Sequence, residues 1–92
     1  MKKIFKYTVA INDTDWVVKM PMGSKVVHVG QQSEKDVTFW SEVIPNMEEV
    51  SRSFRVFGTG HKVPDGYTYI GTSVSNYGPL VWHLYERKTN EN

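Results

Sequence analysis

The chain has 92 residues, of which 39% are hydrophobic and 23% are charged, and its formal net charge is +1. This length and composition indicate one globular domain with a single modest core. The near-zero charge excludes a global field that would draw the protein to nucleic acid or to an anionic membrane. The lack of cysteine in the sequence excludes a disulfide framework, a thiolate zinc site and a cysteine nucleophile.

The sequence also favours the cytoplasm over a membrane or an export pathway. No stretch is long and apolar enough to span a membrane. Near the start, Lys6 interrupts the apolar residues that a signal peptide would need. A chain without cysteine is compatible with a reducing compartment. We therefore expect a cytoplasmic protein that does not bind a membrane.

The first third of the chain predicts three strands. Residues 5–11 alternate between apolar and polar side chains, with the period of two that a half-buried strand shows. Residues 12–15 supply turn side chains and residues 16–20 follow as a strand, so we expect these two strands to pair as a first hairpin. Residues 26–31 alternate again and predict a third strand.

The middle of the chain predicts a central strand. Residues 37–44 are apolar on both faces, which is typical of such a strand, and the alternation places Phe39 and Trp40 on opposite faces. Residues 45–49 begin like a helix but leave room for only one turn before strand character returns at residues 54–57. We predict a loop or a single helical turn there.

The last third predicts a loop and two strands. Three glycines and a proline in residues 58–66 indicate a loop. Residues 67–73 predict a short strand, and Gly71 inside it indicates a bulge or a close approach of another backbone segment. Residues 80–85 alternate strongly and predict the last strand. The polar residues 87–92 predict a frayed end.

Short strands separated by turns, with no sustained helical period, predict an all-β fold. We expect a small antiparallel barrel or sandwich of about six or seven short strands, with at most one helical turn. A single β domain should span residues 1–88, followed by a polar C-terminal tail over residues 89–92.

The loop that begins with Gly58, Thr59, Gly60 and His61 is the most informative local feature of the sequence. Its glycines let a ligand approach the backbone, and its N–H groups and polar side chains suit a phosphate or sugar oxygen. It matches neither a Walker loop nor the dinucleotide-binding fingerprint. A plain turn explains the same glycines, so both interpretations stay open.

Three further side chains are candidates for ligand contact. Arg55 is in the strand phase that points away from Phe54 and Val56, and a guanidinium can bind phosphate or stack on a base. Trp40 can stack on the other face of a ring, and Lys6 adds a cation on a strand. Solvated strand faces explain the same residues. We predict a ligand-binding site that consists of Lys6, Trp40, Arg55, Gly58, Thr59, Gly60 and His61.

Catalysis and metal binding have little support in the sequence. His28, His61 and His83 have no metal-ligand spacing, and the first and last lie beside apolar residues, as structural histidines do. A serine, a histidine and an aspartate can be picked from the chain, but no nucleophile elbow is present. We predict that the protein is not an enzyme and uses no metal ion and no cofactor.

Six segments carry the motifs of one family: Ile4-Phe5-Lys6-Tyr7, Met20-Pro21-Met22-Gly23-Ser24-Lys25-Val26-Val27, Phe39-Trp40, Phe54-Arg55-Val56-Phe57-Gly58-Thr59-Gly60-His61-Lys62-Val63-Pro64, Tyr69-Ile70-Gly71-Thr72 and Val81-Trp82-His83-Leu84-Tyr85-Glu86. On these motifs, nearly the whole chain resembles a family of small bacteriophage-encoded proteins, most of them without an assigned function. Its members commonly have proline where this chain has Lys62, so the loop differs there.

The resemblance implies a small phage accessory protein that acts in the host cytoplasm. Some phage proteins of this size are sponges, which form oligomers and sequester cyclic nucleotide signals of host defence. The resemblance therefore implies a non-catalytic anti-defence protein that binds a cyclic dinucleotide or a ligand of the cyclic ADP-ribose type. A domain this small cannot enclose such a ligand alone, so we expect a homo-oligomer with the site at a subunit interface.

Three alternatives stay open. A protein–protein adaptor that inhibits a host protein directly would use Trp16 or Trp40 as its hot spot. Binding of single-stranded nucleic acid to a β surface is disfavoured by the neutral charge, so we do not expect a nucleic-acid partner. An enzyme acting on nucleotides would need His61 as its acid or base, and the sequence offers no partner for it.

Overall fold

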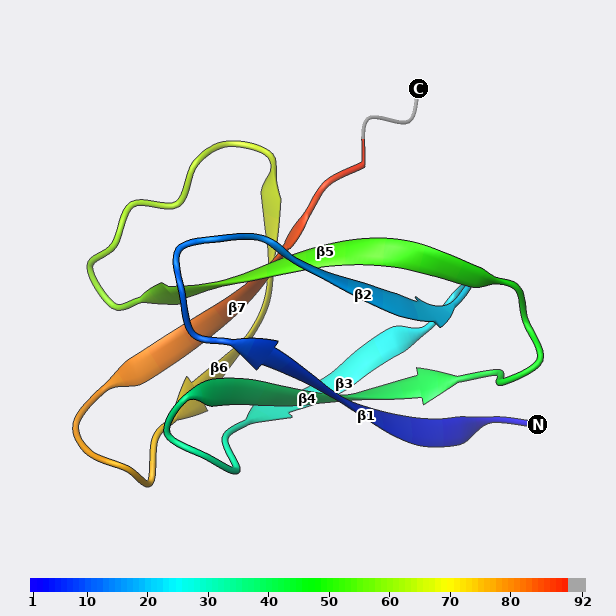
Figure 1. Cartoon of the computed structure of the whole chain (residues 1–92), viewed down its shortest axis with the longest axis horizontal. Helices are drawn as coiled ribbons and strands as arrows, with labels where there is room; N and C mark the ends of the chain where they lie inside the picture. Colours follow the sequence, from blue (N-terminus) through cyan, green and yellow to red (C-terminus); the bar gives the residue numbers. More distant parts are fainter. Residues whose placement is uncertain (90–92) are drawn as a thin grey trace.

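A computed structural model describes residues 1–89, in which seven strands form two antiparallel sheets (Figure 1). The strands are β1 (Lys3–Ala10), β2 (Trp16–Pro21), β3 (Lys25–Gly30), β4 (Asp36–Val43), β5 (Glu49–Gly58), β6 (Tyr67–Val74) and β7 (Val81–Arg87). A three-stranded sheet has the order β1-β4-β3, and a four-stranded sheet has the order β2-β5-β7-β6.

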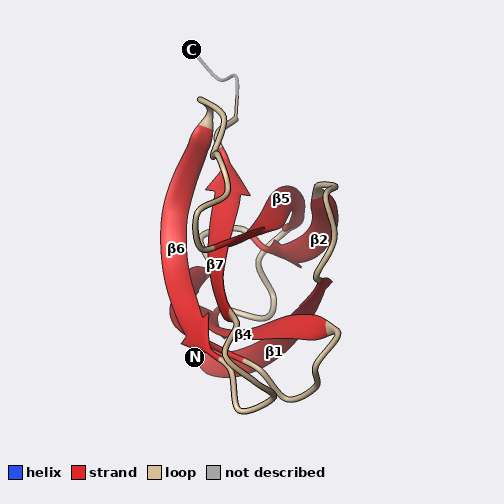
Figure 2. Ribbon diagram, turned by 90° about the vertical axis from the view of Figure 1, so that its left-hand side faces the viewer, coloured by secondary structure: helices blue, strands red, loops and turns tan. Residues whose placement is uncertain are grey.

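The all-β prediction is confirmed. Figure 2 contains strands and loops only, and the described residues include no helix that could cross a membrane. No hydrogen-bonded strand pair joins the two sheets within residues 1–89, so they are not closed into one barrel. Of residues 45–49, where a loop or one helical turn was expected, residues 45–48 lie in a turn and Glu49 begins β5.

The predicted pairing of the first two strands is wrong. β1 pairs with β4, and β2 pairs with β5, so residues 12–15 carry the chain from one sheet to the other. Side-chain pairing explains this choice, because Val9 lies opposite Val37 and Tyr7 lies opposite Phe39. The rings of Tyr7 and Phe39 stack with their centroids 5.3 Å apart. Such cross-strand apolar pairs each stabilise a sheet by roughly 0.2–1 kcal/mol.

The core lies between the two sheets and is built from alternate side chains of each strand. Phe39 of β4 meets Phe54 of β5 with ring centroids 4.7 Å apart, and both side chains are fully buried. β4 is the middle strand of its sheet, as predicted. Trp40 lies on the face of β4 opposite to Phe39. The period of two therefore decides which side chains remain outside the core.

Gly71 marks the place where the edges of the two sheets approach each other. The register of β6 against β7 shifts between Tyr69 and Gly71, which makes a bulge. A Cβ atom on Gly71 would lie only 2.6 Å from Val29 Cγ2 of β3. The predicted bulge is confirmed, the close neighbour is a side chain rather than a backbone segment, and β3 and β6 lie side by side without pairing.

The connection over residues 59–66 is long because it must return along the four-stranded sheet. β5 and β6 each pair antiparallel with β7, so they run parallel to each other on either side of it. The chain must therefore travel from the end of β5 back to the start of β6, which a tight turn cannot do. The predicted loop is confirmed, except that Gly58 is the last residue of β5.

Two strand ends differ from the prediction. β5 begins at Glu49 rather than at residue 54, because its first half pairs with β2. The frayed end predicted from Arg87 is wrong at that residue, which ends β7 and lies opposite Tyr67. Of the tail predicted over residues 89–92, Thr89 is exposed, and residues 90–92 lie outside the described residues.

Candidate functional site

The outward face of the four-stranded sheet carries a group of aromatic and cationic side chains. Phe54 and Val56 of β5 are buried in the core, so Arg55 and Phe57 point to the other side of the sheet. Outward side chains of β6 and β7 lie beside them. We call this surface the aromatic face, and it consists of Arg55, Phe57, Tyr67, Tyr69, His83 and Tyr85.

Strand register sets these side chains in rows across three strands. In one row, Arg55 of β5 is the Cα partner of Tyr85 of β7, which is the partner of Tyr69 of β6. The next row consists of Phe57, His83 and Thr72. Directly opposite side chains in an antiparallel sheet are within contact distance of each other, so the rows form one continuous surface.

Edge-to-face packing holds the rings of the aromatic face together. The centroid of Phe57 is 5.5 Å from that of Tyr67 and 5.3 Å from that of Tyr85, and Tyr85 lies 5.5 Å from Tyr69. Phe57 is only 5% exposed although it points away from the core, whereas Tyr69 is 53% exposed. Such ring pairs add about 0.5–1.5 kcal/mol each beyond the area that they bury. The surface is therefore a fixed platform with an accessible edge.

Arg55 is the cation at the centre of this platform. Its guanidinium carbon lies 5.2 Å from the ring centroid of Phe57. Its Nε atom is shielded from solvent and has no hydrogen-bond partner, and no ion pair involves this residue within residues 1–89. Arg87, by contrast, donates from Nε to Asp15 Oδ2 at 2.7 Å. Buried donors are normally hydrogen-bonded, so the unpaired Nε of Arg55 is an exception that needs an explanation.

Asp15 joins two elements at the edge of the aromatic face. It accepts hydrogen bonds from the Tyr67 hydroxyl and from Arg87. Burial alone raises the pKa of Asp15, but these hydrogen bonds and the charges of Arg87 and Arg55 outweigh it. The pKa of Asp15 therefore lies below its ordinary value of 3.8. Arg87 pairs with this carboxylate and Arg55 acts on it only through its charge, so two guanidinium groups face one carboxylate and the positive charge is in excess.

We expect Asp15 to make the fold sensitive to acid. Because its pKa is lower in the folded than in the unfolded chain, its stabilising contribution is complete at neutral pH and is lost as the pH falls below about 4. Asp15→Asn should lower the free energy of unfolding by about 1 kcal/mol at neutral pH and flatten its fall in acid. Urea unfolding at several pH values measures both. An unchanged acid slope in Asp15→Asn would contradict this role.

His83 anchors the loop after β5 to the aromatic face. Its Nε2 atom lies 2.9 Å from Thr59 Oγ1, and its Nδ1 atom lies 3.0 Å from Thr72 Oγ1. Thr72 Oγ1 is also hydrogen-bonded to the Tyr69 hydroxyl. Both imidazole nitrogens therefore have hydroxyl partners, and a chain of hydrogen bonds links the exposed Tyr69 to Thr59 in the loop.

His61 turns back onto the end of β5. The backbone N–H of Gly58 donates to His61 Nδ1 at 3.1 Å, and the His61 N–H donates to the Gly58 carbonyl at 3.1 Å. A Cβ atom on Gly58 would lie 2.9 Å from His61 Cε1, so glycine is needed there. Because Nδ1 accepts a hydrogen bond, the proton of the neutral imidazole is on Nε2, which can donate to a ligand.

The loop and the start of β7 line a pocket of about 260 Å³. Trp82 and Leu80 provide apolar walls, and Thr59 and His61 provide polar groups. Gly60 has a φ of +88°, which glycine adopts without strain. Pockets for drug-sized ligands measure about 300–1,000 Å³, so this one fits a single ring or phosphate rather than a dinucleotide.

The structure divides the predicted site residues between the two sheets. Arg55 and the Gly58–His61 turn belong to the four-stranded sheet. Lys6 and Trp40 are Cα partners in the three-stranded sheet, and Lys6 Nζ donates to Gln32 Oε1 at 3.1 Å. The outward faces of the two sheets point in opposite directions, so one chain does not bring Trp40 and Arg55 together.

Sequence reasoning missed the tyrosines of the aromatic face and Thr72. The residues 67–73 were recognised as a strand, but the bulge at Gly71 shifts the phase of alternation within it. Tyr69 and Thr72 are three positions apart and nevertheless share a face, which strict alternation does not predict. His83, expected to be structural, does make structural hydrogen bonds, and it also holds Thr59.

No metal site stands out in the described residues. Residues 1–89 hold no group of three or more histidine, cysteine, aspartate or glutamate side chains that could bind a metal ion. The imidazole nitrogens of His83 are occupied by threonine hydroxyls, and Nδ1 of His61 is occupied by a backbone N–H. The groups that this region presents are hydrogen-bonding side chains, a guanidinium and aromatic rings.

Comparison with known proteins identifies a family but no function for it. No curated protein matches the chain, and no solved structure matches it. The model of one family, described as a domain of unknown function, matches residues 1–92, which is the whole sequence. The chain therefore belongs to the DUF7352 family.

Proposed function

We propose that the protein binds and sequesters a nucleotide ligand without catalysis, with Arg55 as the group that takes a phosphate. The observation that carries the proposal is the state of Arg55: a half-buried guanidinium held on the ring of Phe57, with its Nε shielded and without a partner in residues 1–89. A phosphate can accept two parallel hydrogen bonds from the terminal Nη groups of this guanidinium, whereas the shielded Nε would first have to be uncovered.

The neighbours of Arg55 suit the rest of a nucleotide. Tyr85 and Tyr69 lie in the same row, and aromatic rings bind bases by stacking, which is worth about 1–3 kcal/mol per base. The excess positive charge around Asp15 favours an anion over a neutral ligand. The tyrosine rings, the Arg55 guanidinium and the positive charge together support one class of ligand, a nucleotide.

A second copy of the chain is part of the proposal. The aromatic face is an open sheet surface, and a dinucleotide bound there by one chain would stay largely in water. A sponge needs to hide its ligand, so a partner subunit would cover the second side. The resemblance to small phage proteins suggests the ligand class, a cyclic dinucleotide or a molecule of the cyclic ADP-ribose type. Its biological role would then be anti-defence in the host cytoplasm.

The hydrogen bonding favours storage of the ligand over its conversion. General acid–base catalysis needs a side chain free to exchange a proton with the reacting group. The two nitrogens of His83 are held by Thr59 and Thr72, and His61, whose Nε2 is free to meet a ligand, has only the Gly58 N–H on its Nδ1. Among the described residues, neither histidine has a carboxylate partner of the kind that orients a catalytic imidazole, so we expect the protein to release a bound nucleotide chemically unchanged.

We expect Arg55→Ala to abolish sequestration. Purified protein is incubated with cyclic di-AMP, cyclic di-GMP, cyclic GMP–AMP and cyclic ADP-ribose, separated from free ligand, and heated to release what it holds. Wild type should return at least one ligand intact. Losing charge-assisted hydrogen bonds to phosphate costs about 2–3 kcal/mol, so Arg55→Ala should bind it roughly 30- to 150-fold more weakly.

Lys19→Ala is the matched control for this measurement. Lys19 is an exposed cation on the same outward side of the four-stranded sheet, in β2, and it lies outside the aromatic face. Its removal should leave binding within twofold. Recovery of a hydrolysed ligand, or equal losses in Lys19→Ala and Arg55→Ala, would contradict the proposal.

A protein–protein adaptor is the second candidate function. It is favoured by β2, an edge strand on which Trp16 is 42% exposed and Val17 is 60% exposed. Unpaired edge strands with exposed apolar residues can add a strand from a partner protein. This function predicts the opposite dependence: capture of a host protein would survive Arg55→Ala and be lost in Trp16→Ala.

A further inference from the structure

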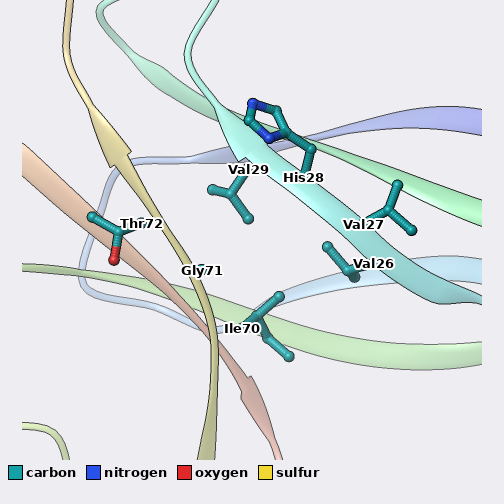
Figure 3. Close-up of a pocket in the computed structure, with 7 residues that line it drawn as sticks. All are labelled: Val26, Val27, His28, Val29, Ile70, Gly71 and Thr72. Carbon is teal, nitrogen blue, oxygen red and sulfur yellow. The ribbon is translucent and has the colours of Figure 1, made fainter.

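A groove runs between the edges of the two sheets, where β3 and β6 lie side by side. Figure 3 shows its narrow part, in which Val29 of β3 faces Gly71 of β6. This part has a volume of about 240 Å³. The groove continues past His28 and Thr72, which line both parts, into a cavity of about 390 Å³. The wide part is the larger of the two and has an aromatic wall.

Trp40 forms that wall. It lies on the outward face of β4, beside His28 of β3, with ring centroids 5.6 Å apart and an interplanar angle of 42°. Gly30 leaves the indole uncovered, because the position of a Cβ atom there would be 3.5 Å from Trp40 Cζ3. His28 of β3 covers one part of the indole, and the part beside Gly30 has no side chain from that residue, so a flat ring can stack there.

The remaining lining is uncharged and rich in hydrogen-bonding groups. It consists of His28, Val29, Gly30, Gln31, Gln32, Thr72, Ser73, Val74 and Asn76, together with Trp40. Gln31 is fixed by hydrogen bonds to Ser33 and from Ser73. Lys6 donates to Gln32 Oε1, which leaves the amide N–H groups of Gln32 free among the described residues. Asn76 also has no side-chain hydrogen bond within residues 1–89.

We propose that the wide part of this groove is a nucleobase site. Amide side chains match the donor and acceptor pattern of a base edge, and an indole binds the face of a base. The volume of about 390 Å³ is at the lower end of ligand pockets, which suits one nucleoside. The lining has no carboxylate, lysine or arginine, and the Lys6 ammonium at its margin is already bonded to Gln32, so a neutral group such as a base suits the cavity.

This site goes beyond the proposed function, because it is separate from Arg55 and recognises a base without its phosphate. Trp40 is on the three-stranded sheet and Arg55 is on the four-stranded sheet. A nucleoside has no phosphate for Arg55, whereas inorganic phosphate has no base for Trp40. The two proposals can therefore fail independently.

Calorimetric titration with adenosine, guanosine, cytidine and uridine tests the site. At least one of the four nucleosides should bind to wild type. Trp40→Ala should weaken that binding tenfold or more, because stacking is lost. Trp16→Ala, which removes an exposed indole far along the sequence in β2, is the matched control and should leave the affinity within twofold.

A second variant keeps the proposal testable even if Trp40→Ala does not fold. Gly30→Val keeps Trp40 in place and puts a branched side chain in contact with the indole, so it should block the site in a folded protein. Arg55→Ala should bind the nucleoside as wild type does. The proposal is overturned if none of the four nucleosides binds, if binding survives both Trp40→Ala and Gly30→Val, or if Arg55→Ala abolishes it.

Discussion

Glu86→Gln should lower the free energy of unfolding by roughly 2–4 kcal/mol, because it leaves Arg52 without its ion-pair partner inside the sandwich. Arg52 donates from Nε and Nη2 to the two carboxylate oxygens of Glu86, at 2.6 and 2.8 Å, and from Nη1 to the Ser24 carbonyl at 2.6 Å. The two side chains are only 19% and 18% exposed. Arg52 also lies over the ring of Phe54, which places the pair at the margin of the core.

Urea unfolding of three variants separates two contributions to the free energy of unfolding: that of the intact ion pair and the cost of one unpaired buried charge. Glu86→Leu and Arg52→Met each leave one partner alone, whereas the double variant Arg52→Met with Glu86→Leu removes both charges. A buried pair replaced by apolar residues is often tolerated, so the double variant should be more stable than either single one. Additive losses in the double variant would show that the two side chains act independently.

Gly71→Val should destabilise the protein by about 1–3 kcal/mol, through overpacking between β3 and β6. A Cβ atom on Gly71 would lie 2.6 Å from Val29 Cγ2 and 3.1 Å from Val29 Cβ. Val29 is branched and 7% exposed, so it cannot swing aside. The edges of the sheets would have to separate. The melting temperature should fall by about 4–8 °C for each kcal/mol.

Compensation at Val29 identifies the cause of this loss. Gly71→Ala combined with Val29→Ala removes the methyl groups that clash, so the double variant should lose less than the sum of the two single changes. Gly30→Ala is the control for adding a Cβ atom to a strand glycine, because its nearest neighbour would be at 3.5 Å, an ordinary contact. A loss in Gly30→Ala equal to that in Gly71→Ala would contradict the explanation by clash.

Local patterns predicted the strands better than their partners. Alternation located the strands and placed Phe39 and Trp40 on opposite faces, and a glycine inside a strand correctly indicated a bulge at Gly71. The pairing of β1 with β4 was not predictable from the turn at residues 12–15, because it depends on contacts such as Tyr7 with Phe39, far apart in sequence.

The candidate site was predictable only in part, because local alternation shows which way a side chain points but not which strands lie beside it. Arg55 is outward because it alternates with buried Phe54 and Val56, which the sequence shows. Its position over Phe57 and beside Tyr85 depends on the register of β5 and β7, which no local pattern fixes. The separation of Trp40 from Arg55 depends on which sheet each strand joins. The sequence therefore identified candidate side chains, but it could not predict which of them lie close together in the folded chain.

Affinity for phosphate-bearing nucleotides, measured by calorimetry on wild type, Arg55→Ala and Lys19→Ala, tests most directly whether the aromatic face binds a nucleotide. We expect wild type and Lys19→Ala to bind the same ligand with affinities within twofold, and Arg55→Ala to bind it roughly 30- to 150-fold more weakly. Equal affinities in wild type and Arg55→Ala, or no binding by wild type to any of the four cyclic nucleotides, would contradict the proposed function.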